Sequence, residues 1–168
     1  MRYLIYIFLL CVLLSCEPVV QDDGIKIDAA IALDPLETAN CYIVSDAGTY
    51  SFETVKGNSR EHVGQVASAE VLWETFGYSL RPQKGDLVRD VIYESDRVYF
   101  RTAEPFKEGN AVIAVRDADG SILWSWHIWM TDEPQAQEYP ANAGVMMDRN
   151  LGATSTGPGH VLSLGLLY

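Results

Sequence analysis

From about residue 40 onward, short runs of apolar, β-branched and aromatic residues alternate with turn-forming residues. This pattern predicts about seven short strands, because no long segment repeats its apolar positions with the helical period of 3.6 residues. The predicted strands cover residues 41–44, 49–55, 69–75, 90–93, 97–101, 111–115 and 121–130.

Two of the connections between these strands predict hairpins. Glu94-Ser95-Asp96 separates one pair of runs, and Asp117-Ala118-Asp119-Gly120 separates the next pair. Asp-Gly between β-prone runs is a strong hairpin signal, because glycine accepts the positive φ that such turns need. The second turn does not fit an EF-hand calcium loop, since the twelfth loop position, which needs a glutamate, is Ile128.

The return strand of the second hairpin has two faces of different character. Ile122, Trp124, Trp126, Ile128 and Met130 share one face, which is predicted to be core. Leu123, Ser125, His127, Trp129 and Thr131 share the other, mixed face, which is expected to be partly covered. The predicted core includes Trp124, Trp126, Ile113, Phe52 and Phe100. Trp129, together with His127, is kept as a candidate ligand contact.

Short strands separated by turns predict an all-β, Ig-like antiparallel β-sandwich over residues 38–133. The Cys…Trp…Cys spacing of antibody domains is missing, so only the architecture is implied. Residues 134–143 are polar, contain Pro134 and Pro140, and are predicted to be a linker or long loop. Residues 144–168 are rich in apolar side chains but too few to enclose a core alone, so they either dock on the sandwich or begin an incomplete second domain.

The first residues are typical of an export signal. Arg2 precedes an unbroken apolar run from Leu4 to Leu14, which is too short to cross a bilayer and fits a signal-peptide core. The run ends in Leu13-Leu14-Ser15-Cys16, which resembles a bacterial lipoprotein signal in which the cysteine becomes acylated. Residues 1–15 are therefore predicted to be a lipoprotein signal peptide, Cys16 the lipidation site, and residues 16–37 an acidic tether.

Charge and chemistry narrow the possible functions further. The net charge of −11 argues against nucleic-acid partners and against a polybasic grip on anionic lipid. Cys41 lies in an apolar run and is expected to be buried, and nothing in the sequence places a histidine near it. His62, His127 and His160 share no metal-ligand spacing. No catalytic residue, metal or cofactor is expected, and Arg149 in Asp148-Arg149-Asn150 is expected to form a structural ion pair or cap a turn.

Three stretches carry a family resemblance: residues 39–44 with 48–52 and 55–58, residues 109–115 with 122–129, and residues 147–153. Together they resemble a group of Bacteroidetes surface lipoproteins related to the fimbrillin family. In that group, an Ig-like module precedes the Fibrobacter succinogenes major paralogous domain. The resemblance implies an outer-membrane, cell-surface location and a role in adhesion, fimbriae or glycan contact. It also implies that the second domain is cut short, because the group normally continues beyond Leu166-Leu167-Tyr168.

Two functions follow as hypotheses. The first is a non-enzymatic surface lipoprotein, an adhesin or fimbria-associated subunit whose partners are fimbrial subunits. The second is an accessory module that captures surface glycans, for which Trp129 would have to be an exposed stacking platform. The accessibility of Trp129 discriminates between them.

Overall fold

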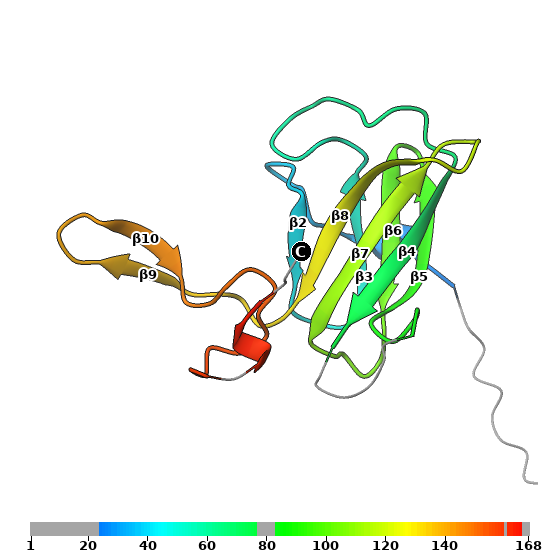
Figure 1. Cartoon of the computed structure of the whole chain (residues 1–168). Helices are drawn as coiled ribbons and strands as arrows, with labels where there is room; N and C mark the ends of the chain where they lie inside the picture. The colour runs from blue at the N-terminus through cyan, green and yellow to red at the C-terminus, as the bar shows by residue number, and fades with distance from the viewer. Residues whose placement is uncertain (1–23, 77–82, 160, 166–168) are drawn as a thin grey trace, which may run out of the picture.

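Two four-stranded sheets face each other, and a two-stranded hairpin extends away from them (Figure 1). The computed structural model describes residues 24–76, 83–159 and 161–165. Its elements are η1 Ile27–Ala29, β1 Ile31–Ala32, β2 Cys41–Val44, β3 Thr49–Glu53, β4 Ser68–Thr75, β5 Val88–Glu94, β6 Arg97–Thr102, β7 Gly109–Arg116, β8 Ile122–Met130, β9 Ala136–Tyr139, β10 Gly144–Met147 and η2 Val161–Ser163. The prediction of an all-β, Ig-like sandwich is confirmed.

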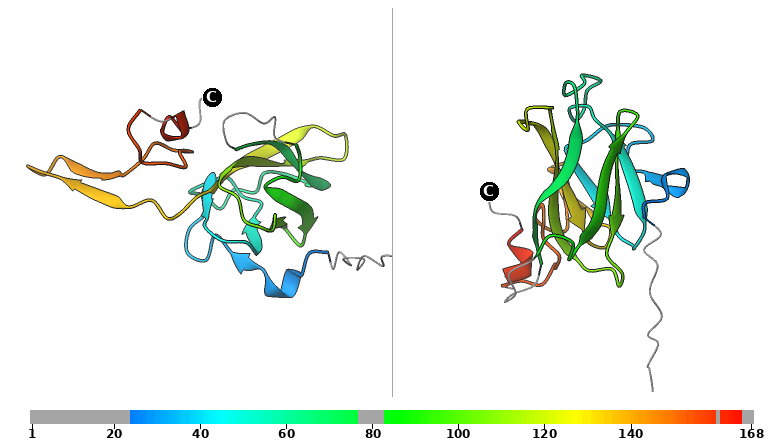
Figure 2. Two further views of the ribbon diagram at one scale, coloured as in Figure 1. Left: turned by 90° about the horizontal axis from the view of Figure 1, so that it is seen from below. Right: turned by 90° about the vertical axis from the view of Figure 1, so that its right-hand side faces the viewer.

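Strand order in the two sheets is β1-β3-β6-β5 and β2-β8-β7-β4. Most neighbours are antiparallel, as expected for strands joined by short turns. The exceptions are β1, which lies parallel to β3, and β2, which lies parallel to β8. Figure 2 shows the sheets as separate layers, and its left view shows the hairpin β9–β10 outside both.

Both predicted hairpins are confirmed. Ser95 and Asp96 connect β5 to β6 with φ of 50° and 60°, the left-handed conformations that a tight two-residue turn requires. Between β7 and β8, the Asp117 carboxylate accepts hydrogen bonds from the backbone N–H of Asp119 at 3.0 Å and of Ser121 at 2.8 Å. This carboxylate therefore stabilises the turn.

The core lies between the sheets and contains most of the predicted residues. Phe52, Phe100, Ile113 and Trp126 are fully buried. The rings of Phe52 and Trp126 are 4.9 Å apart, so strands β3 and β8 meet through aromatic packing. Trp124 is only partly buried at the edge of this core, and its indole N–H donates to Oδ1 of Asn40 at 3.1 Å.

The predicted alternation along β8 is wrong at its beginning. Val115 pairs with Trp124 but Arg116 pairs with Ile122, so the register shifts and Leu123 is the extra residue. Ile122, predicted to be core, is therefore 48% exposed, whereas Leu123 packs against the core. Residues 126–130 are buried on both faces of the strand, which the expectation of a partly covered face did not anticipate.

Two predicted connecting segments contain strands. Within the predicted tether, Ile31–Ala32 pairs with β3, and Asp34 accepts a hydrogen bond from Arg97 at 2.6 Å. The sandwich therefore begins earlier than residue 38. Within the predicted linker, Ala136–Tyr139 forms β9 and pairs with β10, so this stretch is one side of a hairpin.

Candidate functional site

A chain of polar side chains crosses the outer face of the second sheet. The parallel pairing of β2 with β8 puts Cys41 opposite His127, with Cys41 Sγ 3.2 Å from His127 Nδ1. His127 Nε2 is 2.8 Å from Oδ1 of Asn110 on β7. Asn110 in turn donates through Nδ2 to the carbonyl oxygen of Gly152 at 2.9 Å. Three strands and the C-terminal region are thus joined by one line of hydrogen bonds.

The direction of this line follows from its last member. Because the Asn110 amide nitrogen donates to Gly152, its oxygen faces His127 and can only accept a hydrogen bond. His127 therefore carries its proton on Nε2, and Nδ1 is left to accept the hydrogen of the Cys41 thiol.

The electrostatics of Cys41 and His127 keep both groups uncharged at neutral pH. Burial raises the pKa of the Cys41 thiol to about 12 and lowers the pKa of His127 to about 4. A cysteine nucleophile needs to be a thiolate, which a neighbouring imidazole generates by taking up the proton. These two environments oppose that transfer. The arrangement brings together a thiol, an imidazole and an amide, and it holds them as a neutral hydrogen-bonded chain.

Trp129 does not provide an exposed platform. Its side chain is fully buried, and its indole N–H donates to the carbonyl oxygen of Ala153 at 3.0 Å. Ala153 is itself fully buried, and His127 is only 5% exposed. The segment around Gly152 and Ala153 therefore covers the face on which a ligand contact was predicted. The glycan hypothesis required Trp129 at the surface, and this requirement is not met.

The function of this chain has to be argued from its own geometry. No protein-family model, curated protein or solved structure matches this chain.

The region after the sandwich, residues 132–165, is called the C-terminal arm. Its anchor is Arg149, whose side chain is 5% exposed. The guanidinium donates to Oγ1 of Thr131 at 3.1 Å and to Oδ1 of Asp148 at 2.8 Å, and it is paired with Asp132. These hydrogen bonds hold the pKa of both carboxyl groups below its usual range. The structural ion pair expected for Arg149 is confirmed.

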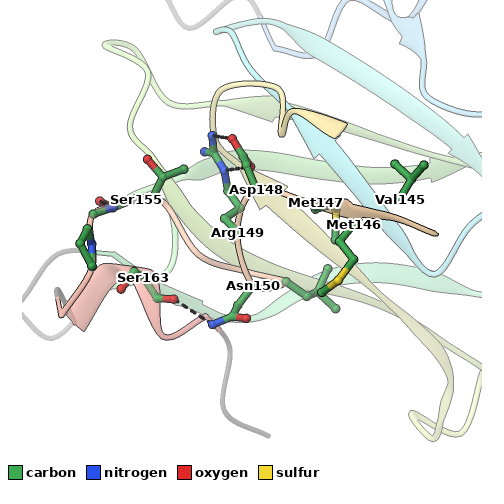
Figure 3. A pocket seen from close by; sticks show the side chains of 12 residues that line it. Val145, Met146, Met147, Asp148, Arg149, Asn150, Ser155 and Ser163 are labelled. Carbon is green, nitrogen blue, oxygen red and sulfur yellow. Dashed lines mark hydrogen bonds and ion pairs between the residues drawn. The ribbon is translucent and has the colours of Figure 1, made fainter. Parts of the chain in front are cut away.

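A hollow of about 630 Å³ lies on the arm, next to β10 (Figure 3). Its wall combines the last three residues of β10 with Leu151 and with polar residues such as Asn150 and Ser155. Val145 and Met146 are 62% and 59% exposed, and Leu151 is 43% exposed. The apolar side chains of the arm are therefore partly exposed, whereas Gly152 and Ala153 are buried and contact the sandwich through hydrogen bonds.

Glu74 is a buried carboxylate whose surroundings identify its role. It is 7% exposed and accepts hydrogen bonds from the backbone N–H groups of Asp86, Leu87 and Val88 at 3.0, 3.2 and 2.7 Å. Its charge is therefore compensated by the backbone at the start of β5, which makes it a structural group.

The remaining expected sites concern metals, membranes and lipid. In the described ranges, no three His, Cys, Asp or Glu side chains come together as a metal site would need. Of the helical residues described, none belongs to a helix with the length and apolarity to cross a bilayer. Cys16 and His160 lie outside the described residues.

Proposed function

We propose that this chain is a non-enzymatic cell-surface lipoprotein, anchored in the outer membrane by an acylated Cys16, that acts as an adhesin or fimbria-associated subunit. The observation that carries the proposal is the hairpin β9–β10. All eight of its strand residues are exposed, and it extends from a sandwich that supports it (Figure 1). Such a shape suits contact with another macromolecule rather than enclosure of a small substrate.

The placement of the first described residues supports this proposal. The first described residues, including Ile27–Ala29, lie on the opposite side of the sandwich from the hairpin (Figures 1 and 2). A lipid at Cys16 would hold the chain from that side and leave the hairpin facing away from the anchor. The neutral state of Cys41 and His127 is also consistent with a protein that performs no nucleophilic catalysis.

The anchor is tested by fractionating cells that express Cys16→Ala. We expect the wild-type protein in the membrane fraction and the variant in the soluble or unprocessed fraction. Cys11→Ala is the matched control, because Cys11 lies inside the predicted signal peptide and should leave fractionation unchanged. Identical detergent partitioning of wild type and Cys16→Ala contradicts the anchor.

The surface role is tested on intact cells. Protease added outside should remove the protein from wild-type cells, and mechanical shearing should release it together with surface filaments. Deletion of the gene should lower attachment of the cells to surfaces or to one another. Protection from external protease in unbroken cells contradicts the proposed location, and unchanged attachment together with no filament association contradicts the proposed role.

A further inference from the structure

The hairpin β9–β10 is an incomplete sheet. Within the part of the chain that the structure describes, each of its strands pairs only with the other. A two-stranded hairpin is marginally stable alone in water, and an unpaired strand edge is a template for another strand. Here both edges are open, and the strand residues are all exposed.

The backbone of β10 identifies which groups its open edge presents. Asp148 N–H donates to Gln135 O at 2.9 Å, so at this position the backbone points toward β9. Successive residues of a strand point their N–H and C=O groups in opposite directions, so Met146 also points toward β9. The N–H and C=O groups of Val145 and Met147 therefore point to the open edge.

This open edge borders the hollow described above. The described wall of the hollow comes from β10 and from later residues, not from β9, so the space lies on the β10 side of the hairpin (Figure 3). A strand added there would pair with Val145 and Met147 and could place its side chains against Met146 and Leu151. Methionine adapts its shape to different partners, which suits a surface of this kind.

The charged residues around the hairpin β9–β10 determine which kind of partner fits its open edge. Residues 139–147 contain no charged side chain, but exposed carboxylates lie on both sides of this stretch, Asp132 and Glu133 at the base of the hairpin and Glu138 on β9 near the turn. Arg149 is the single lysine or arginine after residue 131, and its charge is paired with Asp132 and Asp148. The exposed rim is therefore acidic around an apolar centre. A second copy of this chain would bring the same acidic rim, and an anionic membrane would also be repelled.

We infer that the free edge of β10 binds an extended segment of another protein by strand addition, and that this segment has alternating apolar residues flanked by lysine or arginine. Main-chain hydrogen bonds to Val145 and Met147 would supply affinity, and the hollow and the acidic rim would supply selectivity. The inference deepens the proposed function, because it names the chemistry of the partner of a surface protein.

The test uses the full chain and synthetic peptides. The probe KKVTVTVKK is compared with EEVTVTVEE and with a form of KKVTVTVKK methylated on alternate backbone nitrogens. Binding is measured by calorimetry at low salt, up to about 1 mM peptide. We expect the basic peptide to bind at least about tenfold more tightly than the acidic peptide and than the methylated peptide. No binding of the basic peptide, or equal binding of the acidic one, overturns the inference.

A matched pair of proline variants locates the edge. Met147 and Ala136 face each other across the hairpin, so Met147→Pro removes an N–H from the β10 edge and Ala136→Pro removes one from the β9 edge. We expect at least about tenfold weaker peptide binding for Met147→Pro, and less than about threefold change for Ala136→Pro. Unchanged circular dichroism and melting show that the variants fold. Equal loss in both proline variants overturns the inference.

Two other occupants are outcomes of the same experiments. Concentration-dependent dimerisation that Met147→Pro abolishes assigns the edge to a second copy, and binding to phosphatidylcholine vesicles in place of peptide assigns the hairpin to a membrane. Either result overturns the inference. The fractionation of Cys16→Ala is independent of these results, so failure of the proposed location and failure of the partner assignment are distinguishable.

Discussion

Trp126 and Trp129 lie on opposite faces of β8 and differ in the hydrogen bonding of the indole N–H. Both side chains are fully buried. Nε1 of Trp129 donates to Ala153 O at 3.0 Å, whereas Nε1 of Trp126 has no hydrogen-bond partner among the described residues. Replacing each by phenylalanine removes the same atoms from a fully buried side chain, so the transfer contribution of the two substitutions is the same.

The hydrogen-bonding consequences have opposite signs. Trp129→Phe leaves the buried carbonyl of Ala153 without its donor, which costs about 1–3 kcal/mol, and Trp126→Phe removes an unpaired buried donor, which returns a similar amount. We therefore expect Trp129→Phe to be less stable than Trp126→Phe by at least about 2 kcal/mol.

Urea unfolding followed by far-ultraviolet circular dichroism measures this difference. With a denaturant slope of about 1–3 kcal/mol per molar, the two midpoints should differ by roughly 1 M. Limited proteolysis should also cut the C-terminal arm faster in Trp129→Phe, because the bond that holds Ala153 is lost. Equal midpoints, or a lower midpoint for Trp126→Phe, refute the reasoning.

Three further outcomes are expected. The pKa of His127 is about 4 in the folded chain and 6.5 ordinarily, so the unfolded chain binds the proton first as the pH falls. The free energy of unfolding should therefore fall by about 3 kcal/mol between pH 6.5 and pH 4. Urea midpoints over this pH range should depend less on pH in His127→Gln than in the wild type, and an unchanged dependence contradicts this. Glu74→Gln weakens the hydrogen bonds that backbone N–H groups donate to the charged carboxylate, and it should lower the free energy of unfolding in urea by about 1.5–3 kcal/mol. Glu61→Gln, at an exposed position, should lower it little. Arg149→Met should speed protease cleavage of the arm while the sandwich resists, and a global loss of resistance would place Arg149 in the core fold instead.

The strands of the sandwich could be predicted because their signals are local. Apolar alternation and the turn at Asp117–Gly120 mark β7 and β8 without knowledge of the rest of the chain. The bulge at Leu123 could not be predicted, since a single extra residue leaves the composition of the strand unchanged while exposing Ile122.

The candidate site depended on contacts between distant segments. Cys41 and His127 are 86 residues apart, and only the parallel pairing of β2 with β8 brings them together. The covering of Trp129 by Ala153 is also a contact made after the sandwich is complete. A signal for it existed in Trp129 on the second face of β8, because covering a large aromatic side chain removes much apolar area from water.

The parallel pairing of β2 with β8 has a mechanical consequence. β2 and β8 run in the same direction, as do β1 and β3. If the chain is pulled from its N-terminal side while the arm is held, the force acts along β2 and β8 in opposite senses. All hydrogen bonds between the strands then carry the load together, whereas an antiparallel hairpin pulled at its open end yields one bond at a time. The sandwich is therefore built to resist extension between its two ends.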